Sequence, residues 1–155
     1  MRITKAGEYA IRCVLYLSKQ KEDTVVPRNE IADEMDIPRD FLTKIAQQLS
    51  RSDILEIIQG AKGGFRLLAS PDKLNLLDVI ECIMGTIFFN DCALKPEACS
   101  QSCSCAVHVV WVKARAQFRE TLRNATFTQL IQAKCNQDDC LENLASQEKH
   151  RVVFR

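Results

Sequence analysis

The stretch VPRNEIADEMDIPRDFLTKIAQQLSRSDILEIIQGAKGGFRLL, residues 26–68, decides the fold. Pro27 fits the first turn of a helix from about Arg28 to Met35, and Pro38 opens a second helix after a turn at residues 36–37. Apolar residues recur through both helices and would hold them at a steep angle, namely Ile31, Ala32, Met35, Ile37, Phe41, Leu42, Ile45 and Leu49. This pattern predicts a helix-turn-helix.

The second half of the stretch predicts a β-hairpin. Residues 54–58 and 65–68 are runs typical of strands, and the glycine-rich turn GAKGG at residues 60–64 joins them. A helix-turn-helix followed by a hairpin with a basic tip is the winged form of the motif, in which the second helix enters the major groove and the tip reaches the DNA backbone or minor groove. The predicted fold is therefore mainly α with a small β-hairpin wing.

The solvent side of the second helix carries side chains that can bond phosphates or base edges. A solvated polar face, or a winged helix that binds protein, are the alternatives, but the order of the elements favours DNA. Lys62 would add charge at the tip, and the glycines would let the backbone approach a phosphate. The candidate DNA-binding residues are Arg2, Arg28, Arg39, Asp40, Thr43, Lys44, Gln47, Gln48, Arg51, Gln59, Lys62, Gly63 and Gly64.

A second stretch, CALKPEACSQSCSCAVH at residues 92–108, is too short and too polar to be a core element. It holds Cys92, Cys99, Cys103, Cys105 and His108. Thiolates and a neutral imidazole are ligands of zinc and of iron–sulfur clusters, and three thiolates with one imidazole complete the four donors that a two-iron cluster needs. Tetrahedral zinc could use the same donors, and a thiol switch among the last three cysteines is a third interpretation.

The composition limits the classes of protein that fit. The 155 residues, 46% of them hydrophobic, suffice for one domain with an oligomerising extension. Because no apolar run is long enough to span a bilayer and the N-terminal stretch is charged, a cytosolic protein without a membrane partner is expected. Eight cysteines in such a protein favour metal binding or redox chemistry. No catalytic constellation or nucleotide loop occurs in the sequence, so an enzyme is not expected, and an iron–sulfur electron carrier would not need the wing.

Helical periodicity extends to both sides of these stretches. A first helix begins after the N-cap Thr4, with Cys13 as a small buried hydrophobe on its apolar face. A short helix over residues 76–84 ends at Gly85. Another covers residues 127–134, and the polar tail after it contains Cys135, Cys140 and His150, all expected to be exposed or incidental.

A long amphipathic helix from the cysteine-rich stretch to about Arg123 is expected to form a dimer seam, although it could instead pack within its own subunit. The seam residues would be Val107, Val110, Trp111, Ala114, Phe118 and Leu122. The chain is thus expected to divide into a winged helix-turn-helix domain (1–84), a cysteine-rich loop (85–108), a dimerisation helix with a short following helix (106–134) and a polar tail (135–155).

Five blocks of the sequence resemble the Rrf2 family of bacterial transcription regulators. They are MRITKAGEYAIR (1–12), FLTKIAQQL (41–49), GAKGGFRL (60–67), LLDVIE (76–81) and CAVHVVW (105–111). The resemblance runs from Met1 to about Ile131 and is closest to the iron–sulfur cluster-binding branch that contains IscR and NsrR. It implies a winged-helix homodimer that binds palindromic promoter DNA and holds a cluster in the loop.

The resemblance also implies which residues are ligands. The family cysteines fall on Cys92, Cys99 and Cys105, with His108 as the fourth donor. The first interval is one residue longer than in IscR-like members and Cys103 is extra, so Cys103 is a further candidate. The acid that reaches the cluster in some relatives corresponds to Glu8.

Relatives hold different clusters, so a 2Fe-2S cluster is favoured and a 4Fe-4S cluster is the alternative. IscR-like members carry an arginine at the wing where this chain has Gln59, which predicts a different base preference.

The function expected from this reasoning is promoter binding controlled by a cluster that senses redox, iron, nitric oxide or sulfur status. The alternative is a zinc-dependent or thiol-switched winged-helix regulator. Iron is favoured over zinc because the fold argues for a sensor and zinc has no redox response.

Overall fold

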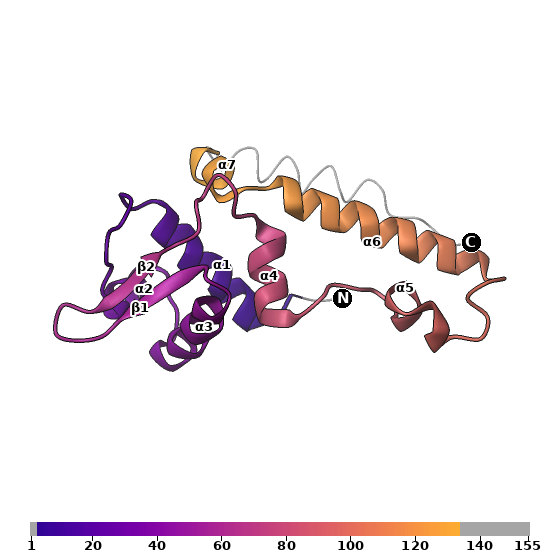
Figure 1. The fold of residues 1–155 in the computed structure, drawn as a ribbon, viewed down its shortest axis with the longest axis horizontal. Coiled ribbons are helices and arrows are strands. Elements are labelled where there is room, and N and C mark those ends of the chain that lie inside the picture. The colour runs from indigo at the N-terminus through magenta and orange to yellow at the C-terminus, as the bar shows by residue number, and fades with distance from the viewer. Residues whose placement is uncertain (1–2, 134–155) are drawn as a thin grey trace, which may run out of the picture.

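The computed structural model describes residues 3–133. The elements are α1 (Lys5–Ser18), α2 (Arg28–Glu34), α3 (Arg39–Arg51), β1 (Leu55–Ile58), β2 (Gly64–Leu67), α4 (Leu76–Met84), α5 (Asp91–Leu94), the 3-10 helix η1 (Pro96–Ala98), α6 (Ala106–Asn124) and α7 (Phe127–Gln132). Figure 1 shows α1 to α4 and the hairpin gathered in one lobe, here called the head (residues 3–84), and α6 extending from it above α5 as the arm (residues 85–124). The predicted fold class is confirmed. The predictions for Arg2, Cys135, Cys140 and His150 fall outside the described residues.

The helix-turn-helix forms where the prolines predict it. Pro27 and Pro38 are the N-caps of α2 and α3. Between the helices, Asp36 adopts a positive φ of 50° and the amide of Ile37 donates to the Ala32 carbonyl at 2.9 Å. Ile37 is buried, so the tight turn also contributes to the core.

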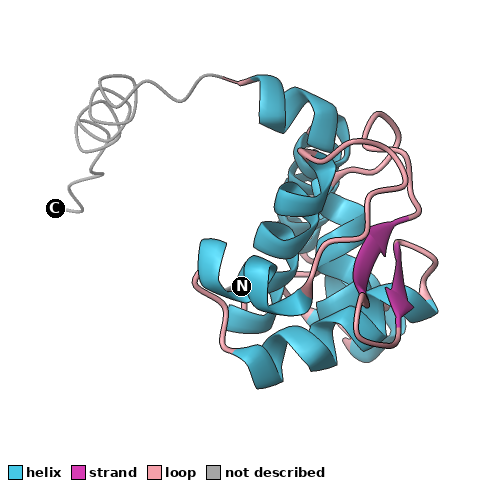
Figure 2. Ribbon diagram, turned by 90° about the vertical axis from the view of Figure 1, so that its left-hand side faces the viewer, coloured by secondary structure: helices cyan, strands magenta, loops and turns pink. Residues whose placement is uncertain are grey.

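The wing is an antiparallel hairpin that is fixed to the rest of the head at its base. β1 pairs with β2 in the register Ile57 to Phe65, and Phe65 also exchanges two backbone hydrogen bonds with Val26, both of 2.9 Å. Gly64 is buried there, and a Cβ atom at this position would overlap the Val26 carbonyl. The close approach of the two backbone segments therefore requires glycine. β2 ends at Leu67, and Leu68, which was expected to continue the strand, is exposed. Figure 2 shows the two strands at one edge of the head.

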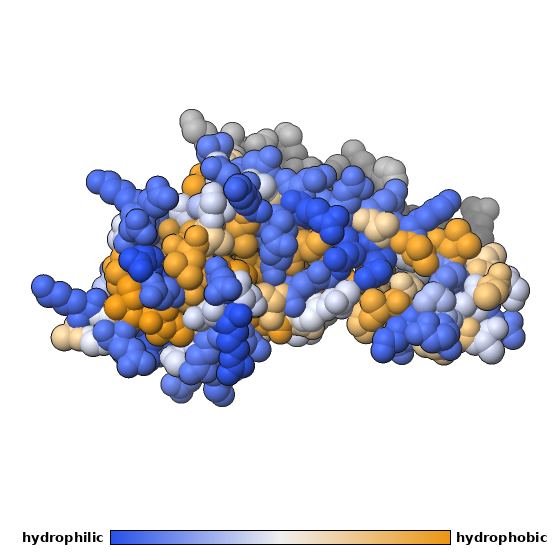
Figure 3. Space-filling model, viewed as in Figure 1, coloured by the Kyte–Doolittle hydropathy of each residue, from blue (hydrophilic) through white to orange (hydrophobic). Residues whose placement is uncertain are grey.

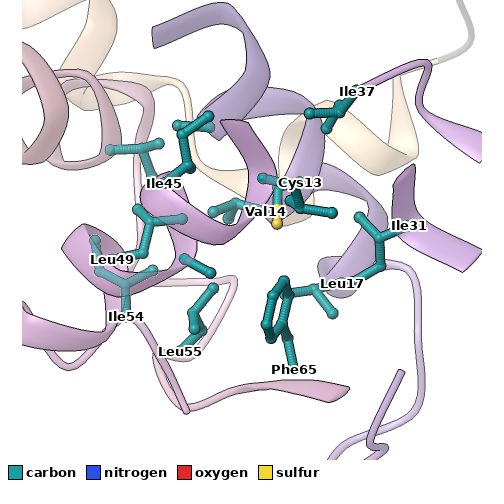
Figure 4. Close-up of a cluster of buried hydrophobic side chains, with 14 of the residues drawn as sticks. Cys13, Val14, Leu17, Ile31, Ile37, Ile45, Leu49, Ile54, Leu55 and Phe65 are labelled. Atoms are coloured by element: carbon teal, nitrogen blue, oxygen red, sulfur yellow. The ribbon is translucent and has the colours of Figure 1, made fainter. Parts of the chain in front are cut away.

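One hydrophobic core joins α1, α2, α3 and the hairpin. Figure 4 shows Cys13 in the middle of this core, with Leu49 of α3 and Phe65 of β2 in the same cluster. Burial raises the pKa of the Cys13 thiol to about 12, so the thiol stays protonated, and the prediction that it is a buried hydrophobe is confirmed. Phe41 is the exception among the predicted core residues: its side chain is 50% exposed.

The chain returns to the head after α6. The Phe127 side chain is fully buried, and its amide donates to the Leu74 carbonyl at 3.0 Å. Asn75 and Thr126 each close a capping box, at the starts of α4 and α7, and form a bridge with each other. The C-terminal end of α6 is therefore anchored to the head at the start of α4.

Candidate functional site

The exposed face of α3 is polar and predominantly basic. Leu42, Ile45, Ala46 and Leu49 are buried against the head, so the helix turns its other side to solvent. The side chains on this outer side are Arg39, Asp40, Lys44, Gln47, Gln48 and Arg51, all exposed, with Thr43 half-buried at the edge. The structure thus brings together the α3 residues predicted from the sequence.

A groove of about 580 Å³ lies between α3 and the wing. Its walls include Arg28 from the start of α2, Thr43 and Gln47 from α3, and residues 57–61 and 63–65 of the hairpin. The Arg28 guanidinium donates to the Thr43 hydroxyl at 3.3 Å, so a cation is held in the lining of the groove beside α3. A polar groove with a basic edge beside a solvent-facing helix suits a phosphate backbone.

The tip of the wing exposes Gln59 and Lys62. Gly60 has a φ of 111°, which favours glycine and lets the hairpin reverse. A Cβ atom at Gly63 would overlap the Ile58 carbonyl, so Gly63, like Gly64, is required by the hairpin itself. The sequence suggested only a role in approaching phosphate, and the packing role was missed.

The cysteine-rich loop contains short helices that the sequence did not reveal. Cys92 lies in α5 and is half-buried, Cys99 follows η1 and is exposed, Cys103 is exposed, and Cys105 is the half-buried N-cap of α6. Among residues 3–133, no three His, Cys, Asp or Glu side chains are grouped so that they could hold a metal ion. The loop therefore does not bring the predicted ligands together, and their assignment stays a prediction.

His108 is the residue of this loop whose surroundings point most directly to a ligand. Its Nδ1 atom is the buried side-chain nitrogen or oxygen that has no hydrogen-bond partner in the described part of the chain. An unpaired buried polar atom costs free energy, so such an atom needs an explanation. Thiol sulfurs and an unpaired imidazole nitrogen are the donor set that suits zinc or an iron–sulfur cluster, and the residues present fit such a group by their chemistry.

Glu8, the other candidate ligand, lies in the first turn of α1. Its carboxylate accepts from the Lys5 ammonium at 2.6 Å, on the solvent side of the helix. The structure therefore places it in the head, paired within its own helix.

Below His108, one face of α6 holds the segment that leads into the loop. Trp111 Nε1 lies 2.8 Å from the Asn90 side-chain amide, and the two form a hydrogen bond when the amide oxygen faces the indole. Arg115 Nε donates to the Ile87 carbonyl at 2.8 Å. Positions 108, 111 and 115 are three and four residues apart, so they lie on one face of α6. Their contacts form a row along this face that ends near the cysteines, and this row is called the α6 contact row below.

The next contact of the α6 contact row connects α6 to the head. Arg119 forms an ion pair with Glu81 of α4, and the Glu81 carboxylate also accepts from the Ile87 amide at 2.7 Å. Both side chains are only about one-fifth exposed. These charged residues were missed in the sequence because 38 positions separate the pair, and only the spacing of Arg115 and Arg119 hints at a shared face.

Cys82, next to Glu81, contacts the C-terminal end of α3. Its thiol lies 3.2 Å from the Ser52 hydroxyl and 3.6 Å from the Gln48 carbonyl at the end of α3. It packs against the main core. Two adjacent residues of α4 thus touch the arm on one side and α3 on the other.

The predicted seam residues of α6 divide into two groups. Val107 and Val110 are more than half exposed, and so is Val109 beside them. Phe118 instead packs against Phe89 and the second small core, which Leu122 also touches. Trp111 and Ala114 are half-buried. Part of the predicted seam therefore packs within its own subunit.

Among residues 3–133, no helix has both the length and the apolar character needed to cross a membrane.

Comparison with known proteins gives the same picture from sequence and from fold. NsrR of Shouchella clausii, an HTH-type transcriptional regulator, is 26% identical over 140 residues, which are 90% of this chain and 92% of NsrR. IscR of Sodalis glossinidius, also an HTH-type transcriptional regulator, is 26% identical over 84% of this chain and 79% of its own length. The structure of CymR, the global cysteine regulator of B. subtilis, covers 85% of this chain and 97% of CymR with a TM-score of 0.72 at 22% identity, which shows a shared fold.

The family model described as "Rrf2: Iron-dependent Transcriptional regulator" matches residues 3–133, which are 131 of the 155 residues. With its winged helix-turn-helix and these relatives, the chain belongs to the Rrf2 family of transcriptional regulators.

Proposed function

We propose that the chain is a cytosolic homodimer that binds palindromic promoter DNA, and that a metal centre in the cysteine-rich loop controls this binding. The observation that carries the proposal is the continuous polar surface formed by the outer side of α3, the groove beside it and the tip of the wing. The net charge of the whole chain is only +1, so this local surface supplies the attraction to DNA.

The side chains of this surface suit two different tasks. Lys44, Gln47 and Arg51 stand on the outermost side of α3, where they would reach base edges in the major groove. Arg28 lines the groove and Lys62 is exposed at the tip of the wing, where both would bind phosphates. Mutation of the first group should change which sequences are bound, whereas mutation of the second should weaken binding to all sequences.

The arm would provide the dimer contact. Val107, Val109 and Val110 expose apolar surface near the start of α6, and Figure 3 shows hydrophobic atoms at that end of the molecule. Exposed apolar surface of this kind marks an interaction site. A two-fold dimer would present two copies of α3 to half-sites about 34 Å apart.

In the loop, Cys92, Cys99, Cys105 and His108 would hold the centre, with Cys103 and Glu8 as further candidates. The unpaired Nδ1 of His108 supports this assignment. The exposed cysteines would have to close toward His108, so binding of the centre would reorganise the loop. An iron–sulfur cluster, most simply 2Fe-2S, would supply a response to oxidation, iron supply, nitric oxide or sulfur status.

The α6 contact row could couple a change in the loop to the DNA-binding surface. Reorganisation around His108 would act on the contacts of Trp111 and Arg115, and through the Arg119–Glu81 pair on α4. Cys82 of α4 touches the end of α3. Because half-sites tolerate little error in spacing and angle, a small shift of α3 would change affinity strongly.

The test begins with protein purified without oxygen. Its visible spectrum, iron content and acid-labile sulfide are measured, and duplexes bound by it are selected from a random library. The affinity for the selected duplex is then compared with and without the centre, in the wild type and in Cys99→Ala. The Cys135→Ala variant is the control with the same change outside the loop. Equal affinities in all four states would remove the switch, and failure to select any duplex would remove DNA binding.

A second candidate is a zinc- or thiol-dependent regulator with the same DNA-binding surface. It is favoured by the exposure of Cys99 and Cys103 and by the absence, within residues 3–133, of a ready group of three metal-binding side chains. The likeness to CymR, a cysteine regulator, points the same way. Colourless protein that contains zinc, or that changes affinity on thiol oxidation alone, would support it.

A further inference from the structure

Phe41 is a large apolar side chain on a surface that is otherwise polar. It lies in the first turns of α3 and is 50% exposed, although its helical position was expected to be part of the core. On a helical wheel it flanks Lys44 and Gln48, three and seven positions further on, and so belongs to the outer side of the helix. The inner side is already complete, because Leu42 and Ile45 are buried beside it.

The ring of Phe41 is held in place from below. It packs edge-on against Tyr9 of α1, with ring centroids 6.0 Å apart and an interplanar angle of 65°. Tyr9 lies under the Arg12 guanidinium, which is 5.8 Å from the ring centroid and is itself bonded to the Met35 carbonyl at 3.2 Å. The exposed half of Phe41 is therefore presented on a fixed support, with little rotamer freedom left to lose on binding.

A second groove lies beside this ring. It has a volume of about 360 Å³ and is lined by Phe41, Ala6, Lys44, Ile45, Gln47, Gln48 and Arg51. Lys44, Gln47 and Arg51 are the residues proposed above to reach base edges, so the ring borders the surface that would face DNA. This groove includes Ala6 of α1, and it shares Gln47 with the groove beside the wing. Figure 1 shows α3 within the head, whereas α6 extends away from it.

We infer that Phe41 reads thymine by packing against its C5-methyl group in the major groove. This rests on the proposed DNA binding and adds to it a specific base preference. The thymine methyl is the apolar group that the major groove presents, and an aromatic side chain at the groove is a suitable partner for it. Lys44 and Arg51 carry donors that would bond guanine or phosphate, so Phe41 is the side chain of this face fitted to select A·T pairs by a methyl contact.

The test uses the duplex selected from the random library, with each thymine replaced in turn by deoxyuridine. This change removes one methyl group and leaves the base pairing intact. Wild-type protein is expected to lose affinity about fourfold at one thymine of each half-site, the value of one buried methyl group, and to be indifferent elsewhere. At that position, Phe41→Ala should bind the thymine duplex and the deoxyuridine duplex with equal affinity. Phe41→Tyr should still bind the thymine duplex more tightly. Leu68→Ala, which removes a side chain of equal exposure away from this face, should behave as the wild type.

The outcomes separate this inference from the proposed function. Indifference of the wild type to every methyl group overturns the role of Phe41 but leaves DNA binding in place. A methyl effect that persists in Phe41→Ala also overturns it. If the library yields no bound duplex, the proposed function fails and the inference fails with it. The deoxyuridine scan of the wild type needs no variant, so poor folding of Phe41→Ala does not prevent a decision.

Discussion

The head and the arm differ in how many of their side chains are buried or hydrogen-bonded within the chain. The head contains a continuous core in which Leu42, Leu49 and Leu55 are fully buried. The helix α6 is longer than any helix of the head, lies wholly within the described residues and has no buried residue. The arm also contains the unpaired nitrogen of His108. The core of the head is thus filled by residues of the chain itself, whereas α6 leaves apolar side chains exposed and His108 Nδ1 without a partner among the described residues.

The largest effect should come from the main core, to which α7 contributes Phe127. Phe127→Ala removes a fully buried side chain and should lower the free energy of unfolding by about 3–5 kcal/mol. Phe88→Ala in the arm removes a ring that is 37% exposed and should cost less than about 1 kcal/mol. Urea denaturation of both variants measures the difference. Equal losses would mean that the arm is part of the same cooperative core.

The next effect concerns the exposed valines of the arm. Val110→Asp places a charge in the predicted seam and should raise the dimer dissociation constant about 100-fold, or about 2.7 kcal/mol, without loss of helix content. Thr121→Asp introduces the same acid at an exposed position near the other end of α6, away from the three valines, and should leave the dimer intact. Sedimentation analysis decides between them. A dimer that survives Val110→Asp would have its seam elsewhere.

The ion pair between Glu81 in the head and Arg119 in the arm should contribute less free energy than the buried Phe127 ring or the valine contact of the dimer. A double-mutant cycle of Glu81→Gln and Arg119→Gln should give a coupling energy of about 1–2 kcal/mol in unfolding, because both side chains are largely screened from solvent. The same cycle on the more exposed pair of Asp33 and Arg39 should give about 0–0.5 kcal/mol.

The cycle should also be run on DNA affinity with and without the loop centre. A coupling in stability with none in regulated DNA binding would show that the Glu81–Arg119 pair holds the arm without transmitting a signal.

The smallest effect is a pH dependence confined to the head. Burial raises the pKa of Cys13 from 9.0 to about 12, so above pH 9 the unfolded chain loses this proton while the folded chain keeps it. Stability from this group is complete below pH 9 and should fall by about 1 kcal/mol between pH 9 and 10. The slope should flatten in Cys13→Ala and remain in Cys103→Ala, whose thiol is exposed. Unchanged slopes in both variants would contradict the burial of this thiol.

The sequence predicted the head better than the arm for a physical reason. Its signals are local: Pro27 and Pro38 mark helix starts, Gly85 marks a helix end, and the apolar period identifies the buried face. Phe41 was assigned wrongly because its spacing fits the core as well as the flank, and only the packing of α1 decides between them.

The arm depends on contacts between distant positions. The pair of Glu81 and Arg119 has no local signature, and the contact of Trp111 with Asn90 is visible only after the chain folds back. The ligand residues could be nominated from their chemistry, because cysteine and histidine at short spacing are distinctive. How they come together could not be derived, since the described loop does not gather them.

Trp111 is the only tryptophan of the chain, and its indole nitrogen meets the side chain just before α5. The emission of an indole depends on the polarity and hydrogen bonding around it. The protein thus carries a built-in optical probe at the entrance of the cysteine-rich loop, and its fluorescence can follow rearrangement there in real time, without any added label.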